Sequence, residues 1–240
     1  GPLRATRRGV IAHAQVLSQL ERNPDAVELI DKVMGPAPDA DIAKYENRYD
    51  AGYDALRGER LERMKKLGLV PAATTAYRGH PHWPAWDKLP ADHKRSEARR
   101  MAVYAAMVDH MDRQIGRVLK HLESSGELDN TVVVFISDNG ADGNSVYDVA
   151  RTREWIHKDM DNSTANLGRP GSFIEYGPGW AQVGSTPLNL YKSFMYEGGI
   201  SVPAIFWSPR QGIAAQQRTQ VGHVMDIAPT IYEMAGARHP

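Results

Sequence analysis

Two oxygen-bearing side chains stand next to each other in Asp138-Asn139-Gly140, directly after an apolar, β-branched run of residues. A carboxylate and a carboxamide in this arrangement suit a hard divalent cation such as calcium or magnesium, which prefers oxygen ligands. Asp-Asn-Gly is also favoured in the tight turn of a β-hairpin. A hairpin needs a partner strand at once, and residues 141–145 (Ala-Asp-Gly-Asn-Ser) do not have the composition of one. Taken alone, these residues leave cation binding and a turn as the two interpretations.

A second set of candidates begins at Lys192, in the run Lys-Ser-Phe-Met-Tyr-Glu-Gly-Gly. A lysine held near a cation can act as a point charge for a tetrahedral oxyanion. Without that context, Lys192 has the ordinary interpretation of a solvated surface lysine, and Gly198-Gly199 that of a turn. The functional interpretation of Lys192 therefore depends on its surroundings.

Hydrophobic periodicity predicts the elements that must position these residues. Apolar residues spaced three and four apart predict helices within 11–35, at about 50–67, at about 95–125 and after Asp226. The run 131–137 has no alternation, which is typical of a strand buried on both faces, and 202–207 is a second strand candidate. The stretch 141–190 predicts a long loop region with a function or with short elements inside it. A helix leading into a buried strand indicates an α/β layered domain.

Composition excludes several classes of function. The 240 residues carry 29 Lys+Arg against 29 Asp+Glu without long blocks of either sign, so the charge pattern of a nucleic-acid binder is missing. There is no cysteine, which excludes disulfides and thiolate chemistry within this sequence. No apolar run is long enough for a membrane span, and the basic residues 1–8 are not followed by a secretion signal. Nucleic acid and membrane are thus not expected partners, and the compartment, bacterial cytoplasm or periplasm, stays open.

Several segments resemble one family in order along the chain. The strand ending in Asp138-Asn139-Gly140 and the Lys-x-x-x-Tyr-Glu-Gly-Gly element at 192–199 are similar to motifs of the bacterial arylsulfatases, in the sulfatase family of the alkaline-phosphatase-like superfamily. The other segments that resemble this family are 49–52 (Tyr-Asp-Ala-Gly), the helix at 100–122, 176–182 and 221–236. The resemblance divides the chain into an unassigned helical segment, 1–39, and a partial sulfatase-like catalytic domain, 40–240. It implies an alkaline-phosphatase-like sandwich, with a largely parallel or mixed central sheet between helices, that is incomplete in this chain.

The resemblance also implies roles for individual residues. Asp138 and Asn139 would bind the metal, calcium in most of the family with magnesium as the alternative, and Lys192 would contact the oxygens of a small-molecule sulfate ester. The physical interpretation agrees, because a cation and a lysine stabilise negative charge that develops on sulfate oxygens. His82 lies in a Pro-His-Trp-Pro run similar to a family element with a sulfate-binding histidine, but here it follows the Tyr-Asp-Ala-Gly segment instead of preceding it.

The family's nucleophile is not found in this sequence. It is a formylglycine made from the first residue of Cys/Ser-x-Pro-x-Arg, and this chain has neither a cysteine nor Ser-x-Pro-x-Arg. No catalytic residue is therefore assigned, and the first expectation is a sulfatase fragment, inactive alone, whose formylglycine belongs to an upstream part. The alternatives are a non-catalytic truncated homologue and a phosphonate or phosphate monoester hydrolase of the same superfamily. A sheet without its early strands would have exposed edges, which predicts self-association or pairing with the N-terminal half.

Overall fold

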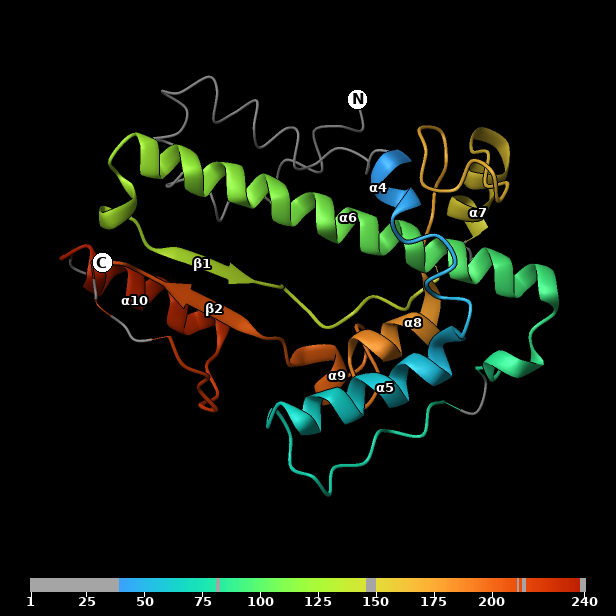
Figure 1. Ribbon diagram of the computed structural model, residues 1–240, viewed down its shortest axis with the longest axis horizontal. Helices are drawn as coiled ribbons and strands as arrows, with labels where there is room; N and C mark the ends of the chain where they lie inside the picture. The colour runs from blue at the N-terminus through green and yellow to red at the C-terminus, as the bar shows by residue number, and fades with distance from the viewer. Residues whose placement is uncertain (1–38, 81–82, 146–149, 211, 213–214, 238–240) are drawn as a thin grey trace.

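The computed structural model describes residues 39–80, 83–145, 150–210, 212 and 215–237 (Figure 1). Within these residues the chain forms seven α-helices, three short 3-10 helices and two strands. The helices are α4 (Asp39–Ala43), α5 (Gly52–Lys66), α6 (Ala91–Ser124), α7 (Ala150–Asp159), α8 (Gly177–Gly184), α9 (Glu197–Ile200) and α10 (Ile227–Met234). The remaining elements are η2 (Trp86–Lys88), η3 (Leu128–Asn130), η5 (Val224–Asp226), β1 (Val133–Ile136) and β2 (Ala204–Trp207).

Strands β1 and β2 form an antiparallel pair, in which Val133 lies opposite Trp207 and Ile136 opposite Ala204. The predicted strand positions are confirmed, and with them the α/β class. An antiparallel pair is compatible with the mixed form of the expected sheet, and parallel strands are not present in the part of the chain that the structure describes. The expectation that β1 is buried on both faces is wrong, because Phe135 is 44% exposed. The apolar run indicates what the strand is suited to contact, and the described residues cover it only in part.

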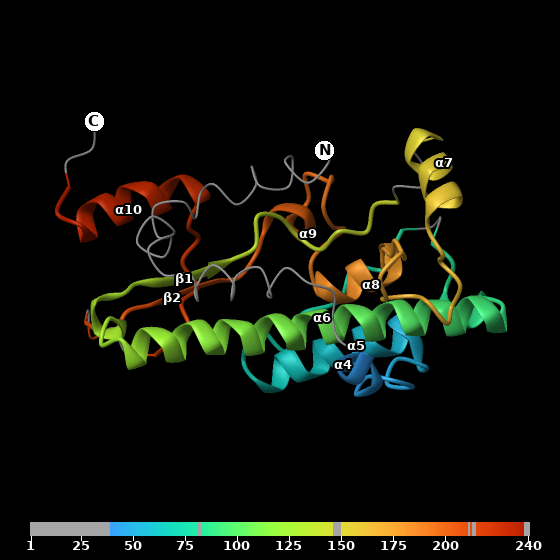
Figure 2. The same ribbon diagram turned by 90° about the horizontal axis from the view of Figure 1, so that it is seen from above.

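Helix α6 is the longest element and spans the whole molecule (Figure 1). It confirms the helix expected at about 95–125. Its buried residues are Gln114 and four small ones, Ala98, Ala102, Val103 and Ala106, and the small ones allow neighbouring segments to approach closely. In Figure 2, β1 and β2 lie between α6 and α10, while α4 and α5 lie on the opposite side of α6. The arrangement is layered, with helices on both sides of a very small sheet.

The main core is an aromatic cluster where α5, α8 and η2 meet. Trp180 of α8 is fully buried, and its ring makes edge contacts with Tyr49, Tyr53 and Trp86 at centroid distances of 5.6 to 5.7 Å. Its indole nitrogen donates to the Glu97 carbonyl of α6 at 3.1 Å, which satisfies the polar atom of the buried ring. This cluster fixes α5 and α8 against the first half of α6.

Gly52 begins α5 in the left-handed region, with φ +82°. A Cβ atom there would lie 2.1 Å from the Trp86 ring, so only glycine allows this ring to close the aromatic cluster. The Tyr-Asp-Ala-Gly segment that contributed to the family resemblance thus has a packing role.

Other predictions have mixed outcomes. The helices expected at about 50–67 and after Asp226 are α5 and α10, and the region 141–190 does contain short helices, α7 and α8. The helices expected within 11–35, and so the segment 1–39 almost entirely, lie outside the described residues. In the part of the chain that is described, no helix combines the length and the apolar character that crossing a membrane requires.

Candidate functional site

The Asp138-Asn139-Gly140 turn follows β1 directly. The Ser137 hydroxyl donates to the Asn139 carbonyl at 2.8 Å, and the Asn139 side-chain nitrogen donates to the Gly140 carbonyl at 2.8 Å. These bonds leave the Asn139 amide oxygen and the exposed Asp138 carboxylate as acceptors. The hairpin interpretation is wrong, because β1 pairs with β2 and not with residues 141–145.

Gly140 joins this turn to the segment that contains Lys192. Its backbone nitrogen donates to the Gly199 carbonyl at 2.9 Å, and the backbone nitrogen of Lys192 donates to the Ala141 carbonyl at 2.9 Å. A Cβ atom at position 140 would lie 1.8 Å from the Gly198 carbonyl oxygen. The two segments therefore approach to backbone contact, and the absence of a side chain at Gly140 is what permits this.

Gly198 also has no room for a side chain, but because of its own segment. A Cβ atom there would lie 2.0 Å from the Leu190 carbonyl oxygen, and the Gly198 carbonyl accepts from the Ser185 hydroxyl at 3.2 Å. Gly198-Gly199 lies in the middle of α9 and is buried, so its interpretation as a mere turn is wrong. The close contact at Gly198 folds the segment that contains Lys192 onto itself, next to the Asp138 turn.

Lys192 is paired with a carboxylate that sequence analysis did not single out. Its Nζ donates to Asp142 Oδ2 at 2.8 Å. The other oxygen of Asp142, Oδ1, accepts from the backbone nitrogen and the side-chain nitrogen of Asn144, at 3.1 and 2.9 Å. Asn144 in turn donates to the Ser193 hydroxyl at 2.9 Å. No local signal marks Asp142 as the partner of a lysine, because Lys192 lies 50 residues away along the chain.

The charges of this pair stabilise each other. The Asp142 carboxylate, and at longer range that of Asp138, raises the pKa of Lys192, against a smaller opposing effect of burial. For Asp142, burial acts to raise the pKa, but the hydrogen bonds from Lys192 and Asn144 together outweigh it and lower the pKa below its ordinary value. Both side chains are therefore ionised at neutral pH.

His82 lies outside the described residues, but its neighbour Trp83 is placed. The Trp83 ring stacks on Tyr191 at a centroid distance of 5.0 Å, and the Tyr53 hydroxyl donates to the Pro84 carbonyl. Since Tyr191 directly precedes Lys192, the described part of this loop lies against the Lys192 segment. The functional interpretation of His82 stays a prediction.

Asp138 and Asn139 present two side-chain oxygens, whereas a calcium ion takes about six to eight oxygen ligands. Among the residues that the structure describes, no group of three His, Cys, Asp or Glu side chains is assembled for a metal. The chemistry of the two donors suits calcium or magnesium, and the remaining ligands would have to come from groups outside this turn.

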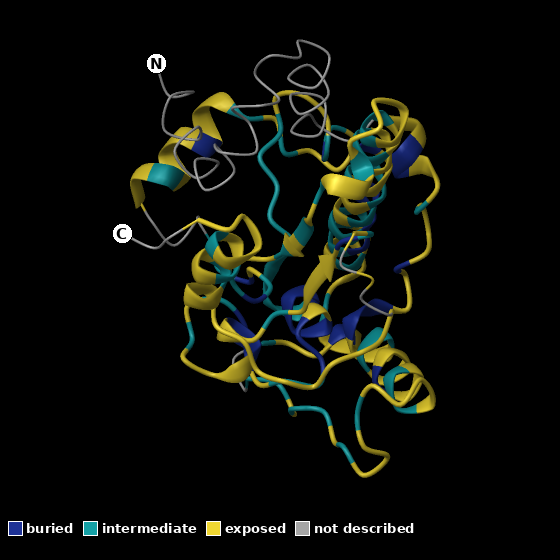
Figure 3. Cartoon of the chain, turned by 90° about the vertical axis from the view of Figure 1, so that its left-hand side faces the viewer, coloured by how far each residue is buried: buried dark blue, intermediate teal, exposed yellow. Residues whose placement is uncertain are grey.

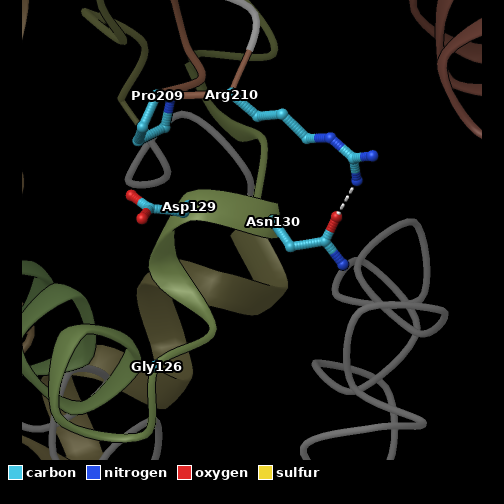
Figure 4. A pocket seen from close by; sticks show the side chains of 5 residues that line it. All are labelled: Gly126, Asp129, Asn130, Pro209 and Arg210. Atoms are coloured by element: carbon cyan, nitrogen blue, oxygen red, sulfur yellow. Dashed lines mark hydrogen bonds between the residues drawn. The ribbon is translucent and has the colours of Figure 1, made fainter.

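A separate pocket of about 670 Å³ lies at the other end of the sheet. It is lined by Gly126, Asp129, Asn130, Pro209 and Arg210, and Figure 4 shows Arg210 reaching toward Asn130, with a bond of 2.5 Å. These residues flank the Val133 end of β1, whereas Asp138 follows its Ile136 end. The pocket is not part of the candidate site.

Comparison with known proteins points to one family. The profile of the family described as Sulfatase matches residues 34–237. An uncharacterized sulfatase of Schizosaccharomyces pombe is 44% identical over 210 residues, which are 85% of this chain and 37% of that protein. An arylsulfatase of Klebsiella aerogenes is 36% identical over 206 residues, which are 83% of this chain and 43% of that protein. The chain spans about two fifths of the length of these relatives.

A mammalian relative is more distant. The N-acetylgalactosamine-6-sulfatase of Mus musculus is 28% identical over 137 residues, which are 57% of this chain and 20% of that enzyme.

Proposed function

The chain belongs to the sulfatase family, and from this premise we propose that it supplies the cation-binding and oxyanion-binding side of a site that hydrolyses sulfate monoesters. One observation carries the proposal. The Asp138 turn and the Lys192 segment, far apart along the chain, meet in backbone contact through Gly140 and Gly199. A Cβ atom at Gly140 would collide with the Gly198 carbonyl, so this contact requires glycine at position 140, which two unrelated surface features would not.

Each of these residues has a separate task in the proposal. Asp138 and Asn139 hold a hard divalent cation, calcium with magnesium as the alternative, through their side-chain oxygens. When bound, the cation offsets negative charge on the sulfate oxygens. Lys192 carries three N–H donors, one of which is used by Asp142, so two remain for oxygens of the sulfate group. Fixed donors of this kind stabilise charge that grows in the transition state.

The substrate class in this proposal is an aryl sulfate or another small sulfate monoester. One relative is named an arylsulfatase and another an N-acetylgalactosamine-6-sulfatase, so sulfate ester chemistry is common to both while the alcohol differs. The nucleophile is a formylglycine expected outside these 240 residues. Because the chain spans only about two fifths of its relatives, catalysis by the whole protein is part of the proposal.

A calcium titration of the purified protein tests the metal ligands. We expect Asp138→Ala to weaken calcium binding at least tenfold in isothermal titration calorimetry, because it removes the charged ligand of the turn. Asp129→Ala is the matched control, since Asp129 is an exposed aspartate at the other end of β1 and should leave calcium affinity unchanged. Equal affinities of the wild-type protein and Asp138→Ala would contradict the assignment.

Turnover of 4-nitrophenyl sulfate by the same protein, with excess calcium, tests the assignment of the nucleophile. No release of 4-nitrophenol is expected without formylglycine. Turnover that Asp138→Ala abolishes would mean that another group attacks the sulfur atom.

A further inference from the structure

The carboxylate nearest to the proposed oxyanion-binding lysine belongs to Asp142, which has no task in the proposed function. Asp142 is not free to turn away, because Asn144 holds its Oδ1 with two hydrogen bonds and leaves Oδ2 for Lys192. Asn144 is itself fixed to Ser193, the neighbour of Lys192. The negative charge thus stays beside the ammonium group whether or not a ligand is present.

This fixed pair changes how the site responds to the charge of its ligand. A lone ammonium attracts a dianion about twice as strongly as a monoanion at the same distance. A carboxylate 2.8 Å from the ammonium repels the dianion about twice as strongly as well, so the pair cancels much of the advantage of the second charge. The two remaining N–H donors of Lys192 are unaffected, and they bind oxygens of either anion.

The sulfate monoester and the anions that would compete with it differ in net charge. A sulfate monoester carries one negative charge at neutral pH, whereas its product, inorganic sulfate, carries two. A phosphate monoester is also mostly a dianion, because its second pKa is about 6. The lowered pKa of Asp142 keeps its carboxylate charged at the pH where this difference exists.

We propose that Asp142 sets the charge selectivity of the site: through its fixed contact with Lys192 it removes much of the advantage that the dianions inorganic sulfate and phosphate monoester would otherwise have over monoanionic sulfate monoesters. This inference rests on the proposed function of Lys192. Inorganic sulfate and phosphate monoesters would therefore bind more weakly than they would beside a lone lysine.

Two anions that differ in charge but share the sulfate group provide the test: methyl sulfate and inorganic sulfate. Each is titrated at constant ionic strength into the purified, 15N-lysine-labelled protein with calcium, and the Lys192 ammonium resonance, assigned by its loss in Lys192→Met, reports binding. In Asp142→Asn the amide oxygen can still accept from Asn144, so the turn is kept while the charge is removed. We expect the affinity for inorganic sulfate to rise about fivefold more than that for methyl sulfate.

Two further variants separate charge from structure. Asp161→Asn is the matched control, because Asp161 accepts from the Ser163 backbone nitrogen in the same kind of turn but has no ion pair with a described lysine. Its ratio of affinities should equal that of the wild-type protein. Asp142→Glu keeps the charge and should also keep the wild-type ratio.

The outcomes are distinguishable from those of the proposed function. If both anions bind and Asp142→Asn leaves their ratio unchanged, the charge selectivity is overturned while Lys192 remains the oxyanion ligand. If Asp142→Asn weakens both anions equally, Asp142 only maintains the fold, and the inference is again overturned. If neither anion shifts the Lys192 resonance, the proposed role of Lys192 fails and this inference falls with it.

Discussion

The helical half of the molecule and its sheet half bury their apolar side chains to very different extents. In the helical half, α5, α8 and η2 enclose Trp180 completely. In the sheet half, Ile205, Phe206 and Trp207 of β2 are 40% to 57% exposed, and α10 has no buried residue. Figure 3 shows the same contrast, with the exposed strands and the buried core in different places.

Apolar side chains are exposed on both faces of β2. Ile205 and Trp207 point to one face of β2 and Phe206 to the other, because side chains alternate along a strand. All three are exposed, so the helices on either side of the sheet leave both faces of β2 partly open to solvent. The helical half has a core of its own. The sheet half has apolar side chains suited to a core, but many of them are exposed. The candidate site lies where the two halves meet, after β1 and before β2.

The largest expected effect comes from equal truncations in the two halves. Trp180→Ala should lower the free energy of unfolding by about 3–5 kcal/mol, because it leaves a large cavity among Tyr49, Tyr53 and Trp86. Trp207→Ala removes the same side chain from an exposed strand and should cost about 1 kcal/mol or less. Urea unfolding followed by circular dichroism measures both. Similar losses for the two variants would abolish the distinction between the halves.

An ion pair in the helical half gives a smaller, pH-dependent effect. Asp41 is buried in α4, and the hydrogen bonds from Arg113 and Lys44 hold its pKa well below the usual range against the opposing effect of burial. Because the folded pKa is lower than the unfolded value of about 3.9, this stabilisation is present above about pH 4 and is lost as the pH falls further. Asp41→Asn should cost about 2 kcal/mol at neutral pH and less near pH 2, where the carboxyl group of the unfolded chain is protonated and part of the stabilisation is lost.

The exposed neighbour Asp39 provides the control for Asp41. Asp39→Asn breaks an exposed pair with Arg169 and should change stability by about 0.5 kcal/mol or less. Urea midpoints at neutral and acidic pH measure both variants. A cost for Asp41→Asn that is the same at both pH values would contradict the role of its charge.

A charged side chain introduced on β2 should have the smallest effect on stability but a clear effect on self-association. We propose that the partly exposed strands pair with another copy of this chain. Ile205→Lys should weaken self-association about tenfold in sedimentation velocity, since a lysine on an edge strand opposes strand pairing, and should change stability by about 0.5 kcal/mol or less. Leu67→Lys places the same charge on the similarly exposed end of α5 and should not affect association. A wild-type protein that stays monomeric at all concentrations would contradict this proposal.

Local sequence patterns were sufficient to predict three of the α-helices and both strands that the structure describes. The positions of α5, α6, α10 and both strands follow from spacings of three and four or from a continuous apolar run, because these periods describe which side chains share a face. The Asp138 turn and Lys192 were also found, from residue types whose chemistry suits a cation and an oxyanion. In each case the information lies within a few neighbouring residues.

Only the tertiary structure decided which of these segments meet. Gly140 looks like a turn residue in sequence, and its role, backbone contact with the distant segment that contains Lys192, depends on the neighbours that folding brings to it. Asp142 was missed for the same reason, since its ion pair with Lys192 crosses about fifty residues. The burial expected for β1 was wrong because an apolar strand shows only what it is suited to contact. Whether it is covered depends on which other segments fold against it.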